Sequence, residues 1–231
     1  RGLGDVYKRQ IWWRSSYPEV QSTVMRLLKK HLEILVSKVP AIDQPKVMLE
    51  QYTSPPRLVA ELLWCAETVF GDIAGRKVID LGSGTGRFGI GAAYLGAEYV
   101  VLAEIDLRLV RIAWHQAKSL DLGHVVDPVC CDVTSEPFRR AFHTAVQNPP
   151  FGVWRRGSDV RFLEAAMKVA RTVYSLHKAS TIDFILQVVR KVGGKPTVLF
   201  EEVISIPPSM SFHYKREHRV RVVAIRASRE S

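Results

Sequence analysis

Asn148-Pro149-Pro150-Phe151 is a tetrapeptide that can hold an amino group for reaction. The two prolines fix the backbone and lack N–H donors, so their carbonyls stay free. The side-chain oxygen of Asn148 and the carbonyl of Pro149 can each accept one hydrogen from an –NH2 group, which directs the nitrogen lone pair toward an electrophilic methyl group. Because the exocyclic amine of a base is a poor nucleophile, positioning and charge stabilisation must supply most of the catalysis. The motif predicts methylation of such an amine, with Phe151 stacking the displaced base; the structural alternative is a rigid turn after a strand.

A glycine-rich loop, Asp80-Leu81-Gly82-Ser83-Gly84-Thr85-Gly86, closes the first predicted strand. Glycine lets the backbone approach a ligand closely, and ligands of open α/β sheets bind at the carboxyl ends of the strands. Glu104 stands at the end of the second predicted strand, where its carboxylate can accept hydrogen bonds from both hydroxyls of a ribose. The loop and this acid predict a nucleoside-containing cofactor.

The spacing Gly84-x-Gly86-x-x-Gly89 also fits the dinucleotide fingerprint, so a dehydrogenase is an alternative. Asp80 would repel a pyrophosphate, whereas it suits the cationic amino-acid end of S-adenosyl-L-methionine. Asp132 follows the third predicted strand, where it can meet the amino group of an adenine. These acids favour the methyl donor over the dinucleotide.

Alternating hydrophobic patterns predict the elements that must position both motifs. We expect helices at residues 25–39, 57–69, 107–120, 161–170 and 182–192, with a further helix from the glycine loop to Leu95. We expect strands at residues 77–81, 99–104, 125–131, 144–147, 173–176, 197–204 and 219–227. Strands that alternate with helices predict an α/β, Rossmann-like fold, with a mostly parallel seven-stranded sheet, helices on both faces and a C-terminal antiparallel hairpin.

The chain has 231 residues, three cysteines and a formal net charge of +10. No apolar run approaches the roughly 20 residues that span a bilayer, and we recognise no signal peptide. Cys65, Cys130 and Cys131 form no C-x-x-C pair, which indicates thiols in a reducing compartment and neither a disulfide framework nor a zinc site. We therefore expect a cytoplasmic protein with no metal and no membrane contact, whose basic surface suits a polyanion such as RNA.

With both motifs placed, the chain resembles amino-methyltransferases of the class I, Rossmann-like fold. More narrowly, it is similar to the methyltransferase-like protein five family, the archaeal and eukaryotic ribosomal RNA adenine-N6 methyltransferases. The narrower resemblance runs from about Met25 to Arg226. The residues that carry it are Leu49-Glu50-Gln51-Tyr52, Phe151-Gly152, Arg171-Thr172-Val173-Tyr174-Ser175-Leu176-His177-Lys178 and Phe212-His213-Tyr214-Lys215.

The resemblance implies S-adenosyl-L-methionine as cofactor, with Gln51 and a nearby hydroxyl closing over it and Tyr52 among the residues that bind it. The family usually has Pro-Thr after Glu-Gln-Tyr, whereas this chain has Thr53-Ser54, so Ser54 would take the hydroxyl role. The ribose acid of the family is commonly Asp and is Glu104 here. The implied substrate is an adenosine of small-subunit ribosomal RNA near the decoding region. Eukaryotic members also need a small zinc-binding activator protein, which docks along a sheet edge by strand pairing.

Other acceptors remain open. A protein glutamine, as in a release factor, offers the same –NH2 geometry, and guanine N2 in RNA and adenine in DNA also fit the motif. A non-catalytic RNA-binding subunit is a further alternative, although the intact donor loop and Asn148 argue against it. Phe151 and the basic residues near the C-terminus favour a nucleic acid.

Aromatic and basic side chains that could contact RNA follow the catalytic motif and the fifth strand and recur between the last two strands. Structural alternatives are a solvated basic loop and, for His177, a hydrogen bond at a strand end. The expected RNA-contacting residues are Trp154, Arg155, Arg156, His177, Lys178, Phe212, His213, Lys215 and Arg216.

The chain divides into three expected segments. Residues 1–10 look like the translation of a transposon-type sequencing adapter, so residues 1–24 are expected to be an adapter and upstream artefact. Residues 25–56 would form an N-terminal helix and a cofactor-closing segment, and residues 57–231 the methyltransferase domain.

Overall fold

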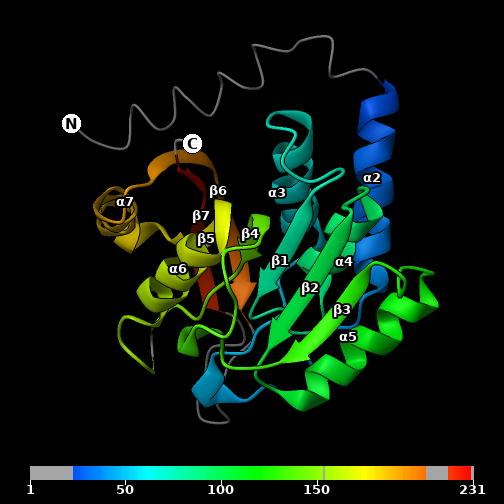
Figure 1. Cartoon of the computed structure of the whole chain (residues 1–231), viewed down its shortest axis with the longest axis horizontal. Helices are drawn as coiled ribbons and strands as arrows, with labels where there is room; N and C mark the ends of the chain where they lie inside the picture. Colours follow the sequence, from blue (N-terminus) through cyan, green and yellow to red (C-terminus); the bar gives the residue numbers. More distant parts are fainter. Residues whose placement is uncertain (1–22, 153, 207–217, 230–231) are drawn as a thin grey trace.

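A computed structural model of the chain describes residues 23–152, 154–206 and 218–229. Within these residues, one seven-stranded sheet has the order β3-β2-β1-β4-β5-β7-β6 (Figure 1). The strands are β1 (Lys77–Leu81), β2 (Tyr99–Glu104), β3 (Val126–Cys130), β4 (Phe142–Gln147), β5 (Ala170–Lys178), β6 (Lys195–Ile206) and β7 (His218–Ser228).

The sheet is parallel from β3 through β5 and ends in an antiparallel hairpin. β1 pairs in parallel with both β2 and β4, and β5 pairs in parallel with β4. β7 is antiparallel to β5 and to β6. The predicted α/β sheet with a C-terminal hairpin is confirmed.

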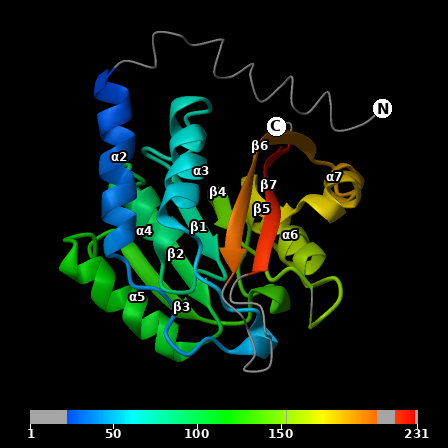
Figure 2. The same ribbon diagram turned by 180° about the vertical axis from the view of Figure 1, so that it is seen from behind.

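Helices cover both faces of the sheet, as Figures 1 and 2 show. One hydrophobic core lies under α2, α3, α4 and α5, and a second lies under α6 and α7. The helices are α2 (Thr23–Lys38), α3 (Pro56–Thr68), α4 (Arg87–Tyr94), α5 (Leu107–Ser119), α6 (Ser158–Val169) and α7 (Ile182–Lys191). Short 3₁₀ turns are η2 (Val47–Leu49), η3 (Val133–Ser135) and η4 (Ala179–Thr181).

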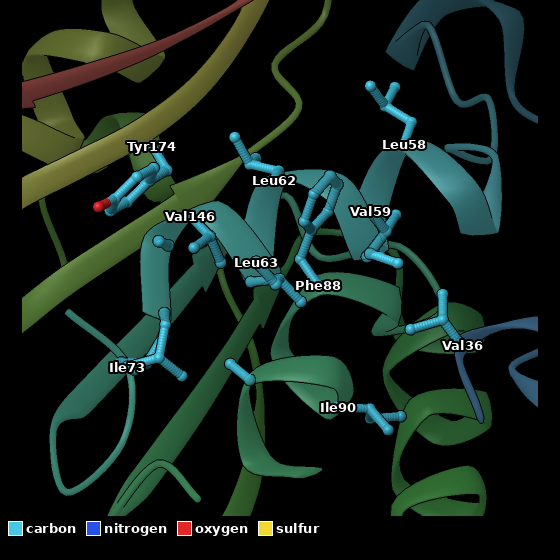
Figure 3. Packing of buried hydrophobic residues seen from close by; sticks show 14 of the residues in the cluster. Val36, Leu58, Val59, Leu62, Leu63, Ile73, Phe88, Ile90, Val146 and Tyr174 are labelled. Carbon is cyan, nitrogen blue, oxygen red and sulfur yellow. The ribbon is translucent and has the colours of Figure 1, made fainter. Parts of the chain in front are cut away.

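The first core joins the N-terminal helix to the sheet. Val36 of α2 and Leu63 of α3 are fully buried with Val146 of β4 in one cluster (Figure 3). α2, from the expected N-terminal segment, therefore shares one core with helices and strands of the expected methyltransferase domain. Residues 1–22 of the expected artefact lie outside the described residues.

The strand after α6 is longer than predicted. β5 begins at Ala170, where the predicted helix had its last residue, and it continues to Lys178. Its pairing with β4 and β7 on either side extends it beyond the short apolar run at residues 173–176. His177 and Lys178 consequently lie within β5 and do not follow it, which corrects the predicted strand end.

Gly89 of α4 sets how closely this helix packs on β2. A Cβ at Gly89 would lie 2.0 Å from Leu102 Cδ2 and 3.1 Å from Val100 Cγ1. We expect Gly89→Ala to lower the stability by about 1–3 kcal/mol, because the added methyl overpacks a filled interface. Thermal unfolding measures this loss. In the control Gly123→Ala, the Cβ meets the flexible Lys118 side chain at 3.0 Å, and we expect a smaller change. Equal melting temperatures for the two variants would contradict this packing.

Candidate active site

The site lies where two neighbouring strands send their chains to opposite faces of the sheet. The glycine loop follows β1 and leads into α4, whereas Asn148 follows β4 and leads toward α6. A crevice at such a switch point is the usual ligand site of an open α/β sheet. A cavity lies in this crevice. Its lining residues are Ile42, residues 48–54, 82–85, 87–88, 103–105 and 131–134, and Asn148, Pro150, Arg155, Ser158, Arg161 and Phe162.

The predicted donor residues divide into two groups. Gln51, Tyr52, Ser54, Gly82, Gly84, Glu104 and Asp132 all line the cavity. Asp80 and Gly86 are buried and lie outside this lining.

Asp80 supports the glycine loop from behind. Its side chain is 1% exposed, and Oδ2 accepts a hydrogen bond of 2.8 Å from the backbone N–H of Gly89. Gly86 has a φ of 94° and caps α4, and a Cβ there would lie 3.1 Å from Ile90 Cδ1. Direct contact of Asp80 with the cationic end of the donor was expected, but the structure gives both residues the role of shaping the loop.

Glu104 connects the loop to the next strand end. Its Oε2 accepts from the backbone N–H of Gly84 at 2.9 Å, and its Oε1 accepts from that of Asp106 at 2.9 Å. The side chain is 6% exposed, and this burial raises the pKa of Glu104. The carboxylate therefore forms part of the cavity wall in a fixed orientation.

Asp132 lies on the wall beyond β3. Its Oδ1 accepts from the backbone N–H of Thr134 at 2.8 Å and from the Thr134 hydroxyl at 2.7 Å. These bonds make Asp132 the cap of η3 and fix its carboxylate at the cavity.

The catalytic motif is held by the segment that precedes α3. The Tyr52 hydroxyl donates to Asn148 Oδ1 at 3.1 Å, and Asn148 Nδ2 donates to Ser54 Oγ at 2.9 Å. The Phe151 ring packs against the Tyr52 ring, with centroids 5.2 Å apart, and Lys178 Nζ lies 5.5 Å from the Phe151 centroid. Phe151 is only 9% exposed and does not line the cavity, so it supports Tyr52 and does not present the open stacking face that was expected.

Thr85 of the donor loop and Arg87 of α4 hold the segment between α2 and α3 by hydrogen bonds. Sequence reasoning missed both residues. Arg87 donates from Nη1 to the Ser54 carbonyl at 2.7 Å and from Nη2 to the Val39 carbonyl at 2.9 Å. The Thr85 hydroxyl donates to the Pro40 carbonyl at 2.7 Å. These bonds join segments far apart in the sequence, so no local pattern could have revealed them.

Asp106 is a third residue that sequence reasoning missed. It holds Lys46 and Gln51, which belong to the same segment before α3. Its carboxylate accepts hydrogen bonds from Arg108 and from Gln51 Nε2, the latter at 3.2 Å. It also forms an ion pair with Lys46 Nζ at 3.0 Å. The Arg108 bond, with help from Lys46 and Gln51, holds the pKa of Asp106 well below its usual range. An aspartate just before a helix is a common N-cap, and that signal could have identified it.

The rim of the cavity carries exposed cationic and aromatic side chains. Trp154 is 42% exposed and its backbone N–H donates to Glu50 Oε1 at 2.9 Å. Arg155 and Arg161 are exposed and line the cavity, and Arg156 is exposed beside them. This rim presents positive charge to whatever enters the cavity.

His177 has a different environment from the one expected of an RNA contact. It is fully buried, its Nε2 lies 2.8 Å from Ser175 Oγ, and burial lowers its pKa to about 3. A neutral buried imidazole cannot contact a phosphate, so His177 is withdrawn from the RNA-contacting set. The expected contacts Phe212, His213, Lys215 and Arg216 lie outside the described residues.

Among the described residues, no group of three or more His, Cys, Asp or Glu side chains could hold a metal ion. Among the helices of that part of the chain, none is long and apolar enough to cross a membrane.

Known proteins are similar to this chain in both fold and sequence. Residues 62–175 match the family model "Methyltransferase small domain". The rRNA N(6)-adenosine-methyltransferase METTL5 of Danio rerio is 36% identical over 201 residues, which cover 85% of this chain and 97% of that protein. The Drosophila melanogaster protein of the same description is 35% identical over 202 residues, covering 85% and 94%. The crystal structure of Pyrococcus horikoshii protein PH1948 has a TM-score of 0.76 at 34% identity, covering 87% of this chain and 96% of that one.

The fold, the glycine loop and the family match define a class I methyltransferase that uses S-adenosyl-L-methionine to methylate nitrogen. The cavity fits this cofactor, because the loop glycines and the fixed carboxylate of Glu104 form its wall. Within that class, the chain belongs to the METTL5 family.

Donor affinity should depend on pH through Asp80. Burial raises the pKa of Asp80 to about 7, and the nearby Glu104 adds to the shift. Asp80 does not line the cavity, but its negative charge lies behind the donor loop and can attract a cationic donor without direct contact. Below that pH the carboxyl is neutral and this attraction is lost, so we expect affinity to fall about three- to tenfold between roughly pH 8 and roughly pH 6. Calorimetric titration with S-adenosyl-L-methionine measures this. Asp80→Asn, which can still accept from Gly89, should give a flat profile; the same pH dependence in that variant would assign the titration to another group.

Proposed function

We propose that this enzyme methylates the N6 amino group of an adenosine in ribosomal RNA, most specifically in RNA of the small subunit. The observation that carries the proposal is the Asn148 side chain, whose oxygen is fixed at the cavity wall beside the donor loop. The relatives described above are named as rRNA N6-adenosine methyltransferases, which supports adenosine as the acceptor.

In the proposed mechanism, the protein acts by positioning. Asn148 Oδ1 and the Pro149 carbonyl each accept one N–H of the target amine, which aims the nitrogen lone pair at the methyl group. S-adenosyl-L-methionine supplies that methyl group in electrophilic form. The two oxygens also stabilise the positive charge that develops on the nitrogen, and a water-poor site strengthens this effect.

We assign the donor to the crevice between the glycine loop and residues 51–54. Glu104 would accept from the ribose hydroxyls and Asp132 from the adenine amino group, while Gln51 closes the segment over the donor through Asp106. Gly84 has a φ of 56°, which a side chain disfavours, and it provides close backbone approach.

The RNA is proposed to reach the cavity over its basic rim. Arg155, Arg156 and Lys178 can contact phosphates, and Trp154 can stack an unpaired base. Ile206 is the last residue of β6, and His218, its partner, is the first residue of β7. β7 is antiparallel to β5, so its first residues lie toward the carboxyl end of β5. The segment between Ile206 and His218 carries the remaining proposed contacts.

A small zinc-binding activator is proposed as a partner that pairs with an edge of the sheet. β3 and β6 are the edge strands of the described part, and Val129 of β3 is 36% exposed with Cys130 exposed beside it. Strand pairing would satisfy the outer backbone groups of such an edge.

The assay uses labelled S-adenosyl-L-methionine with small ribosomal subunits or their free RNA. The product is digested to nucleosides and resolved by mass spectrometry. N6-methyladenosine, confined to the small-subunit RNA, is the expected product. N2-methylguanosine would move the reaction to another base, and methylation of a release factor in place of RNA would replace the proposal by glutamine methylation. The assay is run with and without the activator, so that a missing partner is not read as a missing activity.

A further inference from the structure

The carboxamide of Asn148 is bonded at both ends by hydroxyls from a segment that lies far from it in the sequence. Tyr52 donates to Oδ1 at 3.1 Å, and Ser54 accepts from Nδ2 at 2.9 Å. In this arrangement Oδ1 and Nδ2 each have their own partner, and turning the amide by a half-turn would break both hydrogen bonds and require both hydroxyls to reverse their roles as donor and acceptor.

The hydroxyl of Tyr52 keeps the proton that it donates to Asn148 Oδ1. Burial and the nearby Glu50 raise the pKa of Tyr52 well above its usual value, so the phenol stays protonated at neutral pH. Its ring is fixed by the Phe151 ring at 5.2 Å. Ser54 is only 7% exposed, and its backbone carbonyl is held by Arg87 at 2.7 Å. The Tyr52 ring cannot move without losing its contact with Phe151, and the Arg87 bond holds the Ser54 backbone in place.

This arrangement determines what Asn148 can offer to an acceptor. A carbonyl oxygen has two lone pairs, and Tyr52 occupies one of them. One lone pair remains for a single N–H of the incoming group, while one N–H of Nδ2 is bound to Ser54. The site therefore accepts a group that donates, such as –NH2, and disfavours one that presents a carbonyl oxygen or an unprotonated ring nitrogen.

We propose that Tyr52 and Ser54 are positioning residues that fix the orientation of the Asn148 amide and so restrict the acceptor to an amine. Both were expected among the cofactor-binding residues, whereas their hydrogen bonds point to the acceptor side. The inference rests on the proposed catalytic role of Asn148, and it assigns to residues 51–54 a function in the transfer step beyond donor binding.

The kinetic test compares Tyr52→Phe, which keeps the ring contact with Phe151, and Ser54→Ala with the wild-type chain. We expect each to lower kcat about tenfold, the worth of one hydrogen bond at a reacting centre, with the Kd for S-adenosyl-L-methionine changed less than threefold. Ser54→Thr should restore kcat, because it returns the hydroxyl. Tyr94→Phe on the exposed face of α4 is the matched control and should match wild type. Unchanged kcat, or a loss confined to donor Kd, would overturn the proposal.

A second readout does not depend on the substrate. Asn148 is the only asparagine of the chain. Selective ¹⁵N,¹³C-asparagine labelling therefore gives the signals of one side-chain –NH2 group in the NMR spectrum, one for each of its two protons. We expect one of its two amide protons to exchange slowly with water, and Ser54→Ala to abolish the difference between them. Tyr52→Phe should shift the carboxamide carbon to lower frequency. Equal exchange of both protons in the wild-type chain would contradict the proposed orientation.

The two readouts separate the two hypotheses. If the wild-type chain methylates a substrate other than RNA, the proposed function is wrong, yet the kinetic and NMR comparisons still decide the positioning role. If RNA is methylated but the variants behave as wild type, the function stands and the positioning role is wrong.

Discussion

Asn148→Ala is expected to lower kcat for methyl transfer at least about a hundredfold, while S-adenosyl-L-methionine still binds within about threefold of wild type. The substitution removes the oxygen that accepts an amine hydrogen, and loss of one group directed at a developing charge typically costs about a hundred- to a thousandfold. Donor affinity should persist because the glycine loop and Glu104 do not depend on Asn148. Single-turnover rates and calorimetric titration measure the two quantities.

The variant should also fold normally. The Tyr52 and Ser54 hydroxyls lose their partner, but both line the cavity, where water can replace it. Gln116→Ala on α5, a helix that packs against β2 and β3, serves as an amide-removing control outside the cavity lining. If Asn148→Ala instead weakened donor binding as much as it slowed transfer, the assignment of Asn148 to the acceptor would be wrong.

The architecture was predictable because its signals are local. The apolar runs at residues 77–81 and 99–104 matched β1 and β2 in full, since strands buried on both faces read as continuous hydrophobic segments. The glycine loop and Asn148 were likewise found from type and spacing alone. Their meeting in space followed from the general rule that ligands bind where neighbouring strands diverge.

The finer geometry was not predictable, because it depends on partners from distant segments. The sequence offers Asp80 as an acid beside a cation, but whether it faces the cavity or Gly89 is decided by how α4 packs on the sheet. His177 could be judged only once β5 was seen to extend through it between β4 and β7. The bonds from Arg87 and Thr85 to residues 40–54 have no local signature at all.

Glu104→Gln is expected to weaken binding of S-adenosyl-L-methionine between about tenfold and about a hundredfold, because two effects add. The neutral amide loses the charge that strengthens hydrogen bonds to ribose hydroxyls, and each such bond to a charged group is worth about 1.5–3 kcal/mol. One carboxylate oxygen, which now accepts from Gly84 or Asp106, is also replaced by an N–H donor that faces another donor. The loop that carries Gly84 should shift as a result. Calorimetric titration gives the Kd directly.

Glu104→Asp separates charge from reach. It keeps the charge and the acceptors but shortens the side chain, and the family commonly has Asp here, so we expect it to retain affinity within about tenfold of wild type. Glu98→Gln removes the same charge at an exposed position immediately before β2, at the opposite end of that strand from Glu104, and should leave the Kd unchanged. If Glu104→Gln bound the donor as tightly as Glu98→Gln, the carboxylate would be a structural group of the loop, and the ribose would have to be held by another residue of the cavity wall.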